Sequence, residues 1–306
     1  RENKITSSID VSGGDGAASM FSQNLDKPYF IANYVYNNSV EAYDFKSDSN
    51  FNINNESGSN GDFINVQALD SNYGIIYSNY TGSNFEIKAY YDWDNFAEAD
   101  KNTNAPSRTL QSGMMTANVS ALTVSPHTTN SSTLMIGLEN GVVIKAENAN
   151  TASPVYTNIT GNQFLGSVSD IEFGLNENEI MVTFHNYSVV NIFYSKDGGE
   201  TWEKLKGGFP QGELGRIGLA RSPQKPDVLY ALVAGTEKTK GFYRSEDNGS
   251  SWNKMNDYMV GDAQYYMEIF PDPHQFDKLY IVEVFTKVSE DGGKTLKSIN
   301  HDNIHV

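Results

Sequence analysis

The stretch Ser195-Lys-Asp-Gly-Gly-Glu-Thr-Trp202 belongs to a pattern that the chain contains three times. The other copies are Ser245-Glu-Asp-Asn-Gly-Ser-Ser-Trp252 and Ser289-Glu-Asp-Gly-Gly-Lys-Thr-Leu296, which gives S-x-D-x-G-x-[ST]-[WL] at spacings of 50 and 44 residues. An aspartate that accepts backbone N–H groups and a glycine with positive φ are typical of a tight hairpin. The pattern predicts a structural turn between two strands, built by Asp197, Asp247 and Asp291 and closed by the core residues Trp202 and Trp252.

A second recurrence shows that these turns belong to a larger repeat. Short alternating segments beginning at Asp170, Arg216 and Tyr266 precede the three turns, and the same interval continued backwards gives unit starts near residues 18, 65, 120, 170, 216 and 266. Six units of four short strands, with no amphipathic helix, predict an all-β fold: a β-propeller of four-stranded blades. A β-sandwich would not repeat at about 50 residues.

Length and composition limit the function classes. The 306 residues contain no cysteine, which excludes disulfides and cysteine-based metal or redox sites, and carry a formal charge of −16. An acidic chain with five arginines repels a phosphate backbone, so nucleic acid is excluded as a partner. No apolar run reaches the length of about 20 residues that a membrane helix needs, so we expect no membrane insertion. The abundance of Asn, Ser, Gly and Tyr favours a secreted or surface-displayed bacterial protein.

The three turns resemble Asp-boxes, also called BNR repeats. The stretch from Gly215 to Val233, with Gly241-Phe-Tyr-Arg-Ser-Glu-Asp, is similar to bacterial sortilin-like propellers, a group often labelled glycosyl hydrolase from its repeats alone. Residues 1–190, including Gly13–Gly16 and Val168–Phe173, resemble propellers in large surface proteins of Bacteroidetes. The resemblance implies an extracellular propeller and specifies fold more strongly than activity.

The resemblance also bears on domain organisation. We expect residues 1–306 to form a single propeller domain that is a fragment of a larger secreted protein. Two ways of completing the propeller stay open. Six blades close on themselves with Ile5–Val11 completing the last sheet, or the chain is part of a propeller of seven or more blades.

Function in a propeller usually sits where the innermost strands begin. The repeat alignment places a chemically mixed set of residues there: Asp15, Asn65, Ser120, Asp170, Arg216 and Tyr266, with Asp62 and Tyr265 close by. The candidate binding-face residues are Asn65, Ser120, Arg216, Tyr265 and Tyr266.

Catalytic signals are weak. A sialidase needs an arginine cluster, and only Arg216 lies on this set. A two-carboxylate glycosidase needs acids about 5 to 10 Å apart, for which Asp15 and Asp170 are the best pair and Asp62 and Glu213 the reserves. Trp93 is predicted to be in the core.

Metal-binding signals are equally sparse. We predict no metal site, and His301 and His305 are a chance pair. Clusters such as Asp92 with Asp94, and Gly13–Gly16, could hold Ca²⁺, and neither matches an EF-hand.

Two functions remain open. The preferred one is a non-enzymatic surface propeller that binds a protein or glycan within a larger protein; the alternative is a polysaccharide-active glycoside hydrolase.

Overall fold

The computed structural model describes residues 18–54, 56, 58–94, 104–186, 190–263, 266–283 and 285–299. Every regular element in these ranges is a β-strand. The strands form six antiparallel sheets of four strands each. This is the fold class of a six-bladed β-propeller and confirms the class predicted from the repeat. In the described part of the chain, no helix is long and apolar enough to span a membrane.

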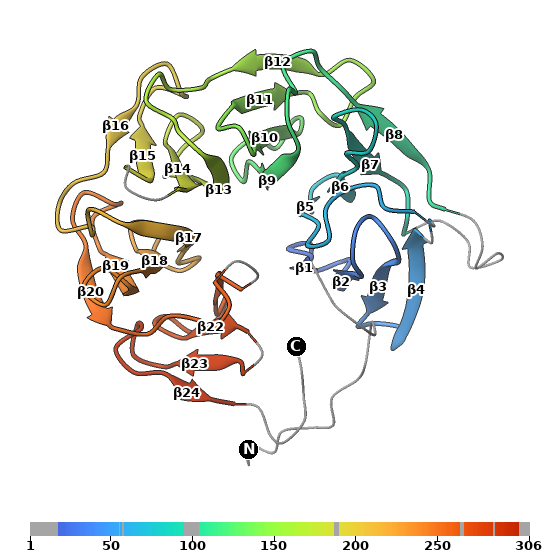
Figure 1. Cartoon of the computed structure of the whole chain (residues 1–306). Helices are drawn as coiled ribbons and strands as arrows, with labels where there is room; N and C mark the ends of the chain where they lie inside the picture. Colours follow the sequence, from blue (N-terminus) through green and yellow to red (C-terminus); the bar gives the residue numbers. More distant parts are fainter. Residues whose placement is uncertain are drawn as a thin grey trace. The chain divides into compact units, whose positions relative to one another are not determined.

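The chain divides into two compact units, residues 1–111 and 112–306. Unit 1 holds two sheets, each with its strands in sequence order (Figure 1). Their strands are β1 (Ser19–Phe21), β2 (Tyr29–Asn33), β3 (Val40–Asp44), β4 (Ser49–Asn54), β5 (Gln67–Asp70), β6 (Ile75–Asn79), β7 (Ile87–Tyr90) and β8 (Ser107–Leu110).

Unit 2 holds the other four sheets. Its strands are β9 (Val119–Val124), β10 (Thr133–Leu138), β11 (Val143–Glu147), β12 (Val155–Asn158), β13 (Ser167–Phe173), β14 (Ile180–His185), β15 (Ile192–Ser195), β16 (Glu203–Lys204), β17 (Leu214–Arg221), β18 (Leu229–Gly235), β19 (Gly241–Ser245), β20 (Asn253–Asn256), β21 (Glu268–Pro271), β22 (Leu279–Val282), β23 (Lys287–Ser289) and β24 (Lys297–Ser298). The first strand of each sheet packs beside the first strand of the next, as β9, β13 and β17 do in Figure 1.

The first strands begin at residues 19, 67, 119, 167, 214 and 268, which differ by one to three positions from the expected starts. Ile5–Val11 lies outside the described residues, so the two ways of completing the propeller remain predictions, as does the single domain.

Burial explains why the second strand of each unit-2 sheet is the most apolar. Every residue of β10 is buried, and so is every residue of β18 except the last. Sheets that pack face to face cover both sides of such a strand, so both side-chain rows must be apolar. Hydrophobic cores therefore form between neighbouring sheets. One core contains Phe184 and Phe193, and another contains Leu229 and Trp252.

The three S-x-D-x-G turns have one hydrogen-bond pattern. In the turn between β19 and β20, the Ser245 hydroxyl donates to Asp247 Oδ1 at 2.9 Å and accepts the Gly249 N–H at 2.8 Å, while Asp247 Oδ1 also accepts the Ser251 N–H at 2.7 Å. The equivalent bonds recur around Asp197 and Asp291. These aspartates are therefore turn acceptors, whose side chains satisfy backbone groups that a strand ladder leaves unpaired.

Candidate functional site

An open cavity of about 420 Å³ lies along the first strands of the four unit-2 sheets. Its polar lining comes from Asp170 and Glu172 on β13, Arg221 on β17 and Glu268 on β21. Because side chains alternate along a strand, Asp170 and Glu172 lie on one side of β13. Apolar lining comes from Leu122, Pro126, Phe173, Leu219, Ala220, Ile269, Phe270 and Pro271. The cavity thus combines carboxylates, a guanidinium and apolar surface.

Asp170 connects two neighbouring sheets. Its Oδ2 accepts the N–H of Leu219 on β17 at 2.8 Å, and its Oδ1 accepts the N–H of Ile171 at 2.8 Å. The pairing of β13 with β14 shifts register between Val168 and Asp170. Both oxygens of this carboxylate are therefore committed to backbone groups.

The environment of Asp170 and Glu172 favours their neutral forms. Burial raises the pKa of Asp170 to about 7, and the negative charge of Glu268 acts in the same direction. Burial also raises the pKa of Glu172 to about 8, with a further contribution from the charge of Asp170 that Arg221 partly opposes. At neutral pH the Glu172 side chain therefore holds a proton and can donate it in a hydrogen bond.

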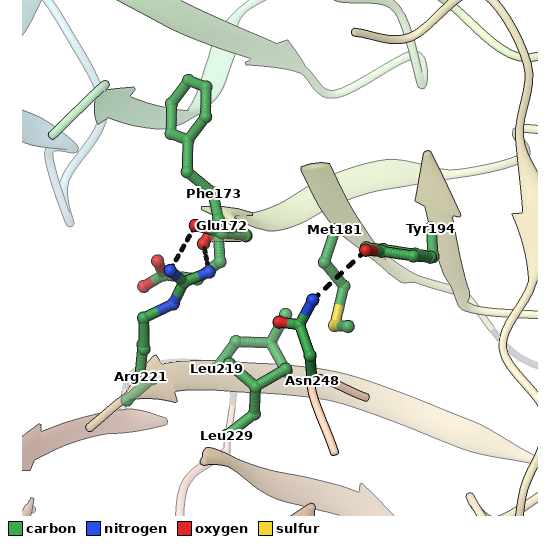
Figure 2. Close-up of a pocket in the computed structure, with 10 residues that line it drawn as sticks. Glu172, Phe173, Met181, Tyr194, Leu219, Arg221, Leu229 and Asn248 are labelled. Carbon is green, nitrogen blue, oxygen red and sulfur yellow. Dashed lines mark hydrogen bonds between the residues drawn. The ribbon is translucent and has the colours of Figure 1, made fainter. Parts of the chain in front are cut away.

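Arg221 is held in place by backbone carbonyl groups. Its guanidinium donates to the carbonyl oxygens of Phe173 and Gly174, and Figure 2 shows it beside Glu172. In the pocket that Arg221 and Glu172 line in Figure 2, Asn248 donates to the hydroxyl of Tyr194 at 3.3 Å. Arg221 thus joins β17 to the end of β13 and gives the cavity a fixed positive charge.

Arg216 and Glu268 form a charged pair near the cavity. Arg216 Nη2 lies 3.5 Å from Glu268 Oε1, and the Glu268 side chain is 61% exposed. A pair this exposed contributes little stability. The Glu268 carboxylate consequently remains accessible to a ligand from solvent.

Three of the predicted binding-face residues have partners inside the fold. Asn65 is 1% exposed, and its amide donates to Ser78 and to the Asn79 carbonyl, so it offers no surface to a ligand. Ser120 donates to the Val168 carbonyl at 2.7 Å and joins β9 to β13. Tyr266 is half-buried against the core beside β21.

Asp15 and Tyr265 fall outside the described residues, so the pair of Asp15 with Asp170 remains a prediction. The two reserve carboxylates also lie away from the cavity lining: Asp62 accepts from Asn79 at 3.1 Å, and Glu213 is exposed just before β17.

The tryptophans are packing residues. Trp252 is 4% exposed and Trp93 is 3% exposed, whereas Trp202 is partly buried and donates to the Ile159 carbonyl at 2.8 Å. None of the three offers a fully exposed ring to a sugar.

Glu172, Arg221 and Glu268 were missed by sequence reasoning. Glu172 stands two residues after Asp170 on β13, so strand alternation places it on the same side as a residue that was already proposed. Tyr266 precedes β21 and packs against the core, so alternation gives no such signal for Glu268. The cavity runs along the first strands, whereas the prediction considered only their beginnings. Alternation along β13 is the signal that could have found Glu172.

The structure holds no group of three His, Asp or Glu side chains suited to a metal among its described residues. At the proposed calcium position, Asp94 pairs with Lys27, which already supplies a positive charge. Gly13–Gly16, His301 and His305 lie outside the described residues.

Comparison with known proteins finds a short sequence match to one carbohydrate-active enzyme. The chain is 32% identical over 93 residues to a xyloglucanase from Paenibacillus sp., a match that covers 29% of this chain and 8% of the enzyme. No family model matches.

Solved structures share the fold over nearly the whole chain. The GH74 enzyme of Niastella koreensis matches with a TM-score of 0.64 at 14% identity, over 94% of this chain and 45% of that one. The GH74 xyloglucanase of Xanthomonas campestris matches with a TM-score of 0.53 at 13% identity, over 94% and 54%. The WD40 β-propeller domain of Doa1 matches with a TM-score of 0.61 at 12% identity, over 94% and 83%. At these identities the likeness concerns the fold, and the chain spans about half the length of the two GH74 chains.

Proposed function

We propose that this chain is an extracellular propeller module that binds a neutral polysaccharide within a larger protein and does not cleave it. The observation that carries the proposal is the state of Asp170. It is the one member of the predicted catalytic pair that the structure describes, and both of its oxygens accept backbone N–H groups. A carboxylate used in this way stabilises the sheet contact and has little freedom for catalysis.

The polysaccharide assignment has separate support. The sequence match is to a xyloglucanase, and the three turns resemble the Asp-boxes of secreted carbohydrate-active and sortilin-like proteins. The cavity mixes apolar surface with carboxylate and guanidinium groups, a combination that can pack on sugar rings and bond their hydroxyls. The chain's charge of −16 disfavours acidic polysaccharides.

Xyloglucan binding tests the proposal. We expect affinity electrophoresis or calorimetry to detect binding by the wild type, with no release of reducing ends. Glu268→Ala removes an exposed cavity carboxylate and should weaken binding about 10-fold to 100-fold, the effect of one lost hydrogen bond to a charged group. Glu237→Ala is the matched control, since that side chain is 88% exposed and does not line the cavity. Absence of binding to any neutral polysaccharide would contradict the proposal.

A second candidate, a glycoside hydrolase, is favoured by one observation. Glu172 has a pKa raised to about 8 by burial and shares its cavity with the exposed Glu268. A protonated acid and an ionised base on one cavity are the two groups that inverting hydrolysis requires. Release of reducing ends from xyloglucan, lost in both Glu172→Gln and Glu268→Gln but kept in Glu237→Gln, would establish this alternative and exclude the non-enzymatic module.

A further inference from the structure

An exposed aromatic pair lies on the loops of unit 1. Tyr36 is in the connection between β2 and β3, and Phe63 is in the connection between β4 and β5. Their ring centroids are 5.9 Å apart and their planes meet at 88°. Phe63 is 45% exposed and Tyr36 is half-buried. The edge-to-face contact fixes the Phe63 ring while leaving much of it in solvent.

The backbone at Tyr36 is held in an unfavourable conformation. Its φ is 58°, in the left-handed region that bulky residues rarely adopt. The buried Asn33 amide donates to the Tyr36 carbonyl at 3.0 Å, and the Tyr36 N–H donates to the Phe63 carbonyl at 3.4 Å. Strain of this kind persists only where surrounding contacts enforce it, and it concentrates at functional positions.

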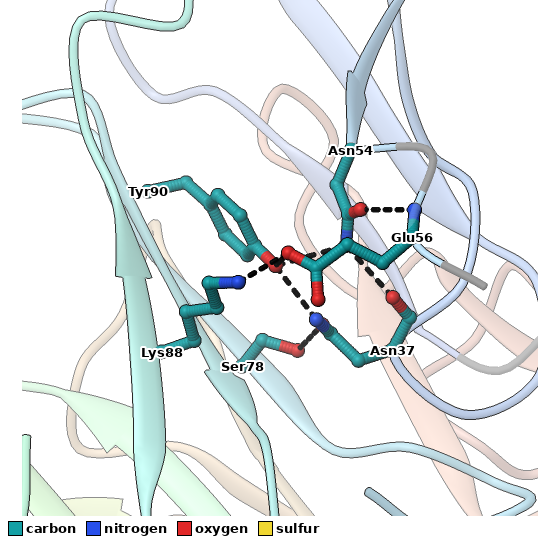
Figure 3. A network of polar contacts seen from close by, with 6 residues as sticks. All are labelled: Asn37, Asn54, Glu56, Ser78, Lys88 and Tyr90. Carbon is teal, nitrogen blue, oxygen red and sulfur yellow. Dashed lines mark hydrogen bonds and ion pairs between the residues drawn. The ribbon is translucent and has the colours of Figure 1, made fainter. Parts of the chain in front are cut away.

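A buried polar network enforces this conformation from the adjacent residue. The Asn37 amide donates to the Tyr90 hydroxyl at 2.6 Å, and its Oδ1 accepts from Ser78 at 2.6 Å (Figure 3). The Asn54 amide donates to the Asn37 carbonyl at 2.7 Å. The loop that carries Tyr36 is thereby anchored to β4, β6 and β7, so the aromatic pair is preorganised.

The chemistry around the pair suits an uncharged ligand. The two connections are joined by the Asn37 N–H donating to the Asn60 carbonyl at 2.9 Å, and Asn60 itself is half-buried beside the pair. Lys88 in the network is paired with Glu56. Asp62, next to Phe63, accepts from the Asn79 amide at 3.1 Å. A ring face with amide groups nearby can stack on a pyranose and bond its hydroxyls, and exposed aromatic patches rimmed by polar groups mark interaction sites.

We propose that Tyr36 and Phe63 form a stacking site for a pyranose ring of a neutral polysaccharide. This inference rests on the proposed function and adds a contact surface on unit 1.

Two variants test the site on intact protein with xyloglucan as the probe. Phe63→Ala should weaken binding about 5-fold to 10-fold, as expected for the loss of one stacked ring. Phe45→Ala is the matched control, because Phe45 is 54% exposed in the same unit but belongs to a different aromatic cluster, and it should bind like the wild type.

Tyr36→Gly separates binding from stability. Glycine adopts a φ of 58° without strain, so this variant should lose affinity while its Tm stays equal or rises. A purely structural role for Tyr36 predicts a lower Tm with unchanged affinity, which would overturn the inference.

The outcomes also distinguish this site from the proposed function. If Glu268→Ala weakens binding and Phe63→Ala does not, the stacking site is wrong and the polysaccharide module stands. If the wild type binds no neutral polysaccharide, both are wrong.

Discussion

The two units connect the third and fourth strands of a sheet with turns of different length and chemistry. Between β19 and β20 of unit 2, a serine, an aspartate and a positive-φ glycine, Gly249, satisfy the turn in the S-x-D-x-G pattern. Between β3 and β4 of unit 1, Asp44 accepts the Lys46 N–H at 2.8 Å, and Asp48 takes the positive φ of 55° while bonding the Tyr43 hydroxyl. Aspartate adopts that φ more readily than most side chains do. The fold therefore requires that these two strands be joined, and it leaves the length and sequence of the turn free to vary.

The units also differ in what holds neighbouring sheets together. In unit 2, side chains on one first strand bond the backbone of the next, as Thr123 does to Ile171 at 2.7 Å and Asp170 does to Leu219 at 2.8 Å. In unit 1 the hydroxyl of a fully buried tyrosine, Tyr90, accepts hydrogen bonds from the side-chain amides of Asn37 and Asn54. Repeated backbone contacts leave a periodic signal in the sequence, whereas a single side-chain network does not.

The largest expected effect breaks the close approach of first strands in unit 2. A Cβ added at Gly218 would lie 1.8 Å from the Met267 carbonyl oxygen, so Gly218→Ala must push β17 and β21 apart. We expect a loss of about 3 kcal/mol in the free energy of unfolding, measured by urea denaturation. Gly113→Ala is the control, since nothing lies within 4 Å of its added Cβ. Equal stability of the two variants would show that unit 2 does not depend on this approach.

The next effect concerns unit 1 and its buried network. Tyr90→Phe removes the hydroxyl that accepts from two buried amides, leaving donors unsatisfied, and should cost about 2 kcal/mol. Tyr91→Phe keeps the ring beneath the Arg108 guanidinium and serves as the control. Chemical denaturation measures both. A Tyr90→Phe variant as stable as the control would mean that the network does not hold the two unit-1 sheets together.

The smallest effect is a pH dependence of unit 2. The pKa values of Asp170 and Glu172 are higher in the folded state than in the unfolded chain, where carboxyl groups titrate near pH 4. Their contribution to the free energy of unfolding is therefore complete below about pH 4 and is lost as pH rises through about 7 to 8. Tm should therefore fall by about 2–4 °C between pH 7.5 and 8.5. Thermal scans of Glu172→Gln should give a flatter profile, whereas Glu147→Gln, which pairs with Lys145 on β11 away from the cavity, should keep the wild-type slope.

The turn aspartates do not obscure that measurement. Hydrogen bonds from Thr201 lower the pKa of Asp197 to about 2, so its stabilising contribution is lost only as pH falls well below 4. The slope of Tm against pH is the decisive quantity. A slope that is identical in Glu172→Gln and in the wild type would show that Glu172 is ionised in the folded cavity at neutral pH.

Much of the fold could be predicted from the sequence, and much less of the site. The turns around Asp197, Asp247 and Asp291 depend on residues within seven positions of one another, so their contacts can be read locally. The interval between repeats then gives the blades. Asp170 was found because it begins a repeat unit, yet its role as an acceptor for Leu219 depends on a neighbouring sheet.

The amino-acid sequence alone determined the propeller class, the hairpin turns and the acidic, cysteine-free character of the chain. These follow from local backbone preferences, from periodic apolar patterning and from composition. The tertiary structure decided which carboxylates share a cavity and which aromatic rings stay exposed. Glu172 and Glu268, like Tyr36 and Phe63, stand on separate strands or loops, and only the packing of each unit sets their burial, their charge state and their neighbours.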